Sequence, residues 1–199
     1  GAGATLDAQR LSRVFDIAVG CQLRVVGLTL ANGYSQSMGG TISISVLMNV
    51  VFSRCMLVNS SAHWMGGAAS IIGGSLLLNN GTEIIDANVI EQEANGGALM
   101  VLNGRVTMTG GSVIRRAFAG WGGALSILGG SRVRISGGSR IEGCSAFRFS
   151  GAVNMIGGEL DVDGGCSFHN SRSVQSHPTW THHTPSLTPV PPLYPHPPA

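Results

Sequence analysis

The chain has 199 residues, of which 43% are hydrophobic and only 11% charged, and its formal net charge is +2. The twelve basic residues are all arginines and are scattered along the sequence, which argues against a nucleic-acid partner. No stretch approaches the ~18 consecutive apolar residues of a membrane-spanning helix, so we expect no transmembrane segment.

An apolar column repeats along the chain at nearly constant intervals. Its members are separated by 27 residues, apart from one step of 30. They are Leu30, Leu57, Ile84, Ile114, Ile141 and Phe168. A second column runs with the same later steps through Leu76, Val106, Val133 and Leu160. Such self-similarity is typical of a solenoid.

Within each repeat, apolar and polar residues alternate, as in Arg132-Val-Arg-Ile-Ser136, which predicts strands with one buried face. Recurrent Gly-Gly pairs exclude long helices, and we expect about three short strands per coil. A coil this short buries its apolar face only by stacking at ~4.8 Å on the next coil. Residues 1–173 are therefore predicted to form a single-stranded parallel β-helix of about six coils. The general rule for parallel crossovers makes it right-handed.

A glycine motif opens each coil. It reads Met38-Gly-Gly-Thr, Met65-Gly-Gly-Ala, Asn95-Gly-Gly-Ala, Trp121-Gly-Gly-Ala and Phe149-Ser-Gly-Ala. We interpret these glycines as turn residues. On the strand after each motif, alternation predicts an outward column of Ser70, Met100, Ser126 and Asn154, which holds no general acid or base.

These motifs resemble the polymorphic outer-membrane-protein (GGA-aliphatic) repeats known from chlamydial surface proteins and autotransporter passengers. The second motif of that family, Phe-x-x-Asn, is incomplete here: Phe168-His-Asn170 is one residue short, and Phe52-Ser-Arg-Cys55 lacks the asparagine. The resemblance covers about residues 5 to 173. It implies a pectin-lyase-like right-handed β-helix, an extracellular or cell-surface location, and a role in adhesion or surface structure.

A polar column follows the first apolar column by two residues. It contains Asn32, Asn59, Asp86 and Asn170, and Arg116 and Gly143 interrupt it. We interpret the column as a partial asparagine ladder, in which side-chain amides hydrogen-bond along the stack at a turn.

The three extra residues of the third coil lie within Asp86–Asn95, where the chain is expected to leave the rod as a loop. Loops on solenoids often carry binding function. Asp86, Glu91 and Glu93 are therefore weak candidates for contacting a partner or cation, beside the simpler interpretation of a solvated loop.

Trp64 and Trp121 both precede a Gly-Gly pair. They are candidates for an aromatic platform that stacks on sugars, and the alternative is that they cover a corner of the rod.

The strand Glu159-Leu-Asp-Val-Asp163 places Glu159, Asp161 and Asp163 on one outward face. Arg132 and Arg134 stand one coil earlier, so we expect opposite-charge pairs between adjacent strands. These three acids remain weak candidates for binding a cation or a sugar. Further back the column holds Arg105 and Ser75, so no acidic cleft continues.

Two features remain open. Cys21, Cys55, Cys144 and Cys166 show neither a CxxC pair nor metal-ligand spacing, and they are either buried thiols or disulfide partners. Residues 174–199 are rich in Pro, His and Thr and are predicted to be a disordered tail.

The pattern favours a non-enzymatic surface or extracellular β-helix, adhesin-like or structural. The alternative is a divergent carbohydrate-active β-helix, a polysaccharide lyase or glycoside hydrolase, that binds or cleaves polysaccharide. We assign no catalytic residue, and we expect no metal and no cofactor. A glycan or another surface protein is the expected partner, and the oligomeric state stays open.

Overall fold

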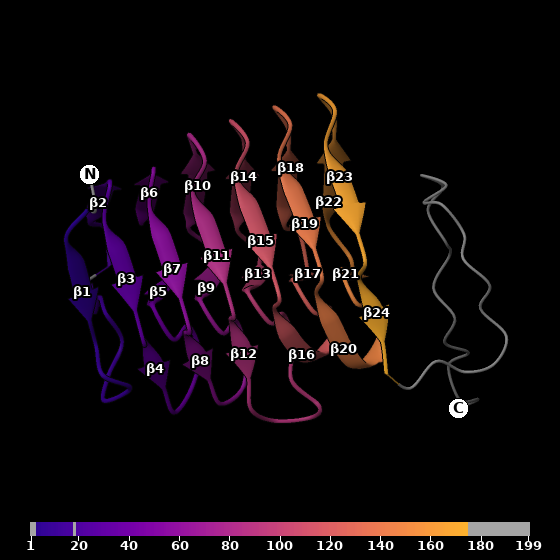
Figure 1. The fold of residues 1–199 in the computed structure, drawn as a ribbon, viewed down its shortest axis with the longest axis horizontal. Coiled ribbons are helices and arrows are strands. Elements are labelled where there is room, and N and C mark those ends of the chain that lie inside the picture. Colours follow the sequence, from indigo (N-terminus) through magenta and orange to yellow (C-terminus); the bar gives the residue numbers. More distant parts are fainter. Residues whose placement is uncertain (1–2, 18, 175–199) are drawn as a thin grey trace, which may run out of the picture.

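The chain forms a parallel β-solenoid (Figure 1). The computed structural model describes residues 3–17 and 19–174. Within them no helix is long and apolar enough to cross a membrane. The strands form four parallel sheets, here called A, B, C and D, of seven, five, six and six strands. Each complete coil contributes one strand to every sheet.

The strands of each sheet stack in chain order. Sheet A consists of β1 (Thr5–Asp7), β3 (Thr29–Ala31), β7 (Met56–Val58), β11 (Glu83–Ile85), β15 (Val113–Arg115), β19 (Arg140–Glu142) and β23 (Ser167–His169). Sheet B consists of β5 (Ile42–Ile44), β9 (Ala69–Ile72), β13 (Leu99–Leu102), β17 (Leu125–Leu128) and β21 (Val153–Ile156). Sheet C consists of β2 (Gln22–Val26), β6 (Asn49–Ser53), β10 (Ser75–Asn79), β14 (Arg105–Met108), β18 (Arg132–Ile135) and β22 (Glu159–Val162). Sheet D consists of β4 (Tyr34–Ser35), β8 (Ser61–Ala62), β12 (Asn88–Val89), β16 (Phe118–Trp121), β20 (Ser145–Phe149) and β24 (Arg172–Ser173).

The predicted columns are confirmed by the strand register. Leu30 pairs with Leu57, and the column continues through Ile84, Ile114, Ile141 and Phe168. The predicted solenoid of about six coils is therefore correct. The prediction of about three strands per coil was wrong, because each complete coil has a fourth strand, which belongs to sheet D. In β4, β8 and β12 these strands have only two residues, too few to produce a visible alternation.

The inward columns merge into one core that runs along the axis. Leu30, Ile84 and Ile114 are fully buried, and residues from every complete coil join the same hydrophobic cluster. Burying a side chain of this size stabilises the fold by roughly 1.5–3 kcal/mol. Because neighbouring coils contribute equivalent residues, the core has no single centre, and stability is distributed over the stack.

The glycine motifs bring the backbone onto itself. Gly97, the second glycine of its motif, lies so close to the next coil that an added Cβ would stand 2.1 Å from the carbonyl oxygen of Gly123. The first glycine, Gly96, has φ +68° and lies against the outer side of β13. A Cβ added to Gly96 would stand 3.1 Å from the amide nitrogen of Met100. Both positions therefore require glycine.

The outward column of sheet B differs from the prediction, because these turns cover it. Ser70 and Ser126 are fully buried, and Met100 is 1% exposed, although alternation places them away from the core. The residue before the glycine pair lies over this face, since Ser126 Oγ donates a hydrogen bond of 3.3 Å to Asn95 Oδ1. The middle of sheet B is therefore covered on both sides.

The asparagine ladder is confirmed over the first coils. Asn59 Nδ2 donates to Asn32 Oδ1 at 2.7 Å, and Asn32 Nδ2 donates to Asp7 Oδ1 at 2.9 Å. Every residue of this column adopts a left-handed backbone conformation, with φ between 51° and 63°, which suits asparagine and aspartate. The column comprises Asn32, Asn59, Asp86, Arg116, Gly143 and Asn170.

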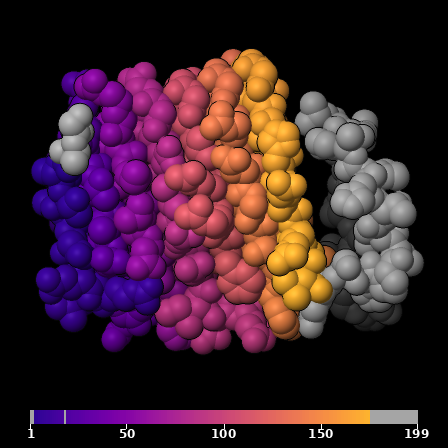
Figure 2. Space-filling model, in the orientation of Figure 1, coloured from indigo at the N-terminus to yellow at the C-terminus, as the bar shows by residue number. Residues whose placement is uncertain are grey.

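The coils stack in sequence order, so the surface colours of Figure 2 run in bands from one end of the rod to the other. Val174 still donates its amide hydrogen to the carbonyl oxygen of Ala146, which places it on the last coil. The predicted tail beyond it lies outside the described residues.

Candidate functional site

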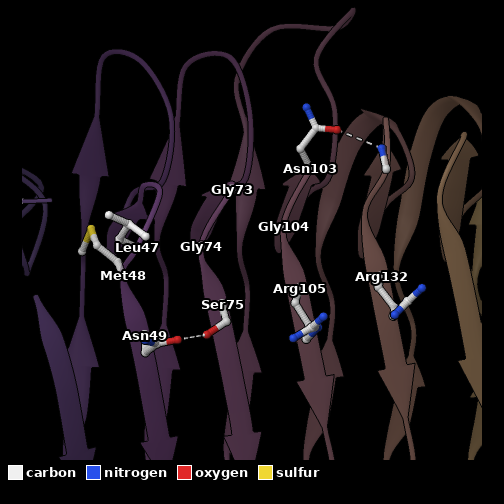
Figure 3. A pocket seen from close by; sticks show the side chains of 11 residues that line it. Leu47, Met48, Asn49, Gly73, Gly74, Ser75, Asn103, Gly104, Arg105 and Arg132 are labelled. Carbon is white, nitrogen blue, oxygen red and sulfur yellow. Dashed lines mark hydrogen bonds between the residues drawn. The ribbon is translucent and has the colours of Figure 1, made fainter. Parts of the chain in front are cut away.

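A groove crosses the turns that join sheet B to sheet C. We call it the B–C groove, and its volume is about 560 Å³. Equivalent turns of neighbouring coils form it, so its wall is rich in glycine (Figure 3). Its lining residues are Leu47, Met48, Asn49, Gly73, Gly74, Ser75, Asn103, Gly104, Arg105, Gly130 and Arg132.

The floor of the B–C groove carries two neighbouring arginines. Arg105 of β14 pairs in register with Arg132 of β18, so the two side chains project from adjacent strands on the same face (Figure 3). The Nε of Arg132 donates to Glu159 Oε2 at 2.8 Å. Among the described residues, Arg105 takes part in no ion pair and no side-chain hydrogen bond.

The amide side chains of the groove are oriented by internal hydrogen bonds. Asn103 Oδ1 accepts the backbone N–H of Gly130 at 2.9 Å, which leaves its Nδ2 group for a ligand or solvent. Asn49 Oδ1 accepts the hydroxyl of Ser75 at 2.6 Å, with the same effect. The groove therefore presents mainly donors: two guanidinium groups and two amide nitrogens.

The predicted acidic row on β22 is present but neutralised. Glu159 pairs with Arg132 as expected. Arg134 Nη1 lies 3.3 Å from Asp161 Oδ2, and its Nη2 lies 2.5 Å from Asp163 Oδ2. The pairing of Asp163 was not predicted, because Asp163 follows the end of β22 and stands opposite Ser136 rather than an arginine. These carboxylates face arginines of the preceding coil and are not arranged around a cavity.

Asp86 belongs to the turn column and not to a binding loop. Arg116, one coil later, holds its carboxylate through Nε at 2.7 Å and Nη2 at 2.9 Å. This bidentate hydrogen bond lowers the pKa of Asp86 below its ordinary value.

The extra residues of the third coil form the expected loop, Ile90–Ala94, which we call the acidic loop. Six positions separate Val89 from Asn95 here, compared with three from Ala62 to Met65 in the coil before. The loop is anchored at its base, where Ala94 is buried against Val89 and Ala119.

The two glutamates of the acidic loop are paired with neighbours in other coils. Glu91 Oε1 lies 3.6 Å from His63 Nε2, and Glu93 pairs with Arg148. The loop also rests on Gly120, where an added Cβ would stand 1.9 Å from the carbonyl oxygen of Gln92. Asp86 lies apart from Glu91 and Glu93, so the three predicted residues do not form one cluster.

The two tryptophans do not make one platform among the described residues. Trp64 is 52% exposed, and its ring lies 5.1 Å from that of His63. Trp121 is half-buried and packs on Phe149 with ring centroids 4.8 Å apart. The structure thus places Trp121 against Phe149. The two residues are neighbours because both occupy the first position of the glycine motif in adjacent coils.

All four cysteines are free thiols. Cys55 and Cys144 are buried in the core, whereas Cys21 is exposed. Burial raises the pKa of the Cys144 thiol to about 11, because a thiolate would lose its solvation there. Among the described residues, no three His, Cys, Asp or Glu side chains gather as a metal-binding group.

The sequence contained a partial signal for the B–C groove. Ser75, Arg105, Arg132 and Glu159 occupy one outward column, and the repeat steps align them. The concave shape depends on the short turns beside that column, and alternation says nothing about their path.

Comparisons of the chain with protein-family models, curated proteins and solved structures found no match.

Proposed function

We propose that this protein is a non-enzymatic surface or extracellular β-helix module with an adhesin-like or structural role. The observation that carries the proposal is the state of its acidic side chains. Among the described residues, every aspartate and glutamate except Asp7 and Asp16 lies beside an arginine or, in the case of Glu91, beside His63. Asp7 accepts hydrogen bonds from Asn32 and from the backbone of Gln9.

Cleavage of a glycosidic bond requires two carboxylates on opposite sides of the bond, one of them free to act as an acid. A calcium-dependent lyase requires a cluster of acidic oxygen ligands. Carboxylates that serve as partners for arginines along a stacked surface support neither reaction. They support a rod whose neighbouring coils carry complementary charges on their outer face.

The surface location is part of the same proposal and rests on the GGA-aliphatic motifs. A non-catalytic rod exposes four long faces to partners, as an adhesin or a structural spacer requires. An antibody raised against residues 3–174 is expected to label intact cells that express the full gene. Labelling only after permeabilisation would contradict this location.

The competing function, a divergent carbohydrate-active β-helix, is tested by a turnover assay. The protein is incubated with polyuronates and neutral polysaccharides, and new reducing ends and unsaturated uronate absorbance are measured. We expect no product above the buffer control. Product from any polymer, if lost in Glu159→Gln or Asp161→Asn, would replace the non-enzymatic proposal with a catalytic one.

A further inference from the structure

We propose that the B–C groove binds a linear acidic polysaccharide, with Arg105 and Arg132 as its cationic contacts. This inference rests on the proposed surface-module function and names the class of partner.

The charge on the floor is uncompensated at one position. Like charges on directly opposed strands destabilise a sheet, yet Arg105 stands between Ser75 and Arg132. The other arginines of the neighbouring strands in this sheet, Arg132 and Arg134, each have a carboxylate partner, Glu159 and Asp161. An anion bound between Arg105 and Arg132 would remove the repulsion. Guanidinium groups bind carboxylate and sulfate groups through paired hydrogen bonds.

The groove offers donors rather than acceptors. The Oδ1 atoms of Asn103 and Asn49 both accept hydrogen bonds within the rod, which leaves their amide nitrogens as the groups that can donate to a ligand. Carboxylates and sulfates only accept hydrogen bonds at neutral pH, which matches this set. A neutral sugar needs acceptors as well and fits less well.

The shape indicates a chain instead of a small anion. The groove is open and crosses several coils, which are spaced at ~4.8 Å, close to the advance of one sugar unit in an extended glycan. The turns beside the floor lack bulky side chains, because they contain Gly73, Gly74, Gly104 and Gly130. The site contains no aromatic side chain on which a nucleic-acid base could stack.

The rim holds a second unusual feature. Leu47 is 73% exposed and adopts φ +64°, a conformation that is unfavourable for a branched apolar residue. Among the described non-glycine residues with positive φ, Leu47 is the only apolar one. An apolar rim beside a cationic floor suits a sugar ring, which has an apolar C–H face and polar edges.

The test compares binding of the full chain to immobilised polygalacturonate, chondroitin sulfate and single-stranded DNA at ~0.15 M salt. Arg105→Gln and Arg132→Gln each remove one charge from the groove. Arg140→Gln removes one charge from sheet A and serves as the matched control. All three positions are exposed strand residues, and far-UV circular dichroism checks that the variants fold alike.

We expect the wild type and Arg140→Gln to bind one of the two acidic polysaccharides equally. Arg105→Gln should bind it about tenfold more weakly. Preference for polygalacturonate identifies carboxylate as the recognised group, and preference for chondroitin sulfate identifies sulfate. Leu47→Ser should weaken binding without changing the salt dependence.

Three results would overturn the inference. They are equal weakening by Arg105→Gln and Arg140→Gln, DNA binding as tight as that of the polysaccharide, and no binding to either polysaccharide. The same samples are assayed for new reducing ends. Cleavage with groove-dependent binding would contradict the non-enzymatic function and leave the groove assignment intact, so the two failures are distinguishable.

Discussion

The turn column that follows sheet A shows how one backbone position accepts different side chains. Asn59, Asp86, Arg116 and Gly143 all adopt the left-handed conformation. Asparagine and aspartate tolerate it well, glycine has no steric cost, and arginine has no intrinsic preference for it. Arg116 is held there by its bidentate contact with Asp86. At this scale the stack imposes the backbone, and each residue then meets its neighbour in the next coil.

The Asp86–Arg116 pair predicts an acid-dependent contribution to stability. Because the folded-state pKa of Asp86 is lowered, its contribution is present above the unfolded-state pKa and is lost as the pH falls through the folded value. Arg116→Gln should lower the free energy of unfolding only slightly at neutral pH, because the pair is exposed to solvent. Urea unfolding at decreasing pH should show the difference shrink as the pH falls below ~4 and vanish below the folded-state pKa of Asp86. A constant difference would mean that Arg116 acts through packing.

The buried thiol of Cys144 predicts an alkaline effect of the opposite sign. A raised folded-state pKa contributes stability below the unfolded value, and this is lost as the pH rises through about 11. The wild type should lose about 2 kcal/mol more than Cys144→Ala between pH ~8.5 and pH 11. Urea unfolding of both proteins across this range measures the difference. Equal losses would show that the folded-state pKa of Cys144 is not raised above its unfolded-state value.

At the scale of elements, the glycine turns determine how closely coils pack. Gly97 and Gly81 require glycine for different reasons. Gly97 has no room for a side chain, whereas Gly81 faces open space but has φ +73°. Steric exclusion by backbone should cost more than conformational strain, because packed backbone cannot move aside.

This difference is measurable with two matched substitutions. Gly81→Ala should destabilise the protein by about 1 kcal/mol, and Gly97→Ala by about 3 kcal/mol or more. Chemical unfolding followed by circular dichroism tests both. If Gly97→Ala does not fold at all, the large effect is still established by comparison with the folded Gly81→Ala. Equal small effects would contradict the close approach of Gly97 to Gly123.

The acidic loop should be dispensable for folding. Deleting Glu91–Glu93 restores the length of the preceding coil, and its ion pairs are exposed and worth little. We expect the free energy of unfolding to change by less than about 1 kcal/mol, measured by urea denaturation. Replacing the same residues with Gly-Ser-Gly is the control for length. A large loss on deletion but not on replacement would show that the coil needs the extra residues.

The repeat columns could be predicted because stacking demands equivalent residues at equivalent positions. The register of the strands in sheet A therefore follows directly from Leu30, Leu57 and Ile84. The register of β18 and β22 follows in the same way from Arg132 and Glu159. The covered face of Met100 could not be predicted, since alternation describes one strand and not the turn that folds over it. The pairing of Glu93 with Arg148 also escaped prediction, because it joins residues that share no column.

At the scale of the whole molecule, burial decreases towards the last coil. In sheet B, Val101 and Ile127 are fully buried, whereas the equivalent Met155 is 43% exposed. Among the described residues, β21 and β22 pair with a strand on one side only. The stability of a solenoid is approximately the sum of contributions from each coil and from each interface between coils. A coil with only one interface is therefore less stable than a coil with two.

Hydrogen exchange is therefore expected to be graded along the rod. Amides of β21–β24 should exchange through local opening, faster than those of β13–β16 by a factor of about ten or more. Mass spectrometry of peptic fragments measures this directly. Uniform exchange over all coils would indicate a single cooperative unit and would contradict the additive picture.

The hydrogen bonds between coils have a mechanical consequence. They lie parallel to the long axis, and residues 3 and 174 belong to opposite ends of the stack. A pull between these ends loads only the few bonds of the outermost coil at a time. The rod should thus lengthen at low force in discrete steps of about one repeat each. It should refold coil by coil when the tension falls.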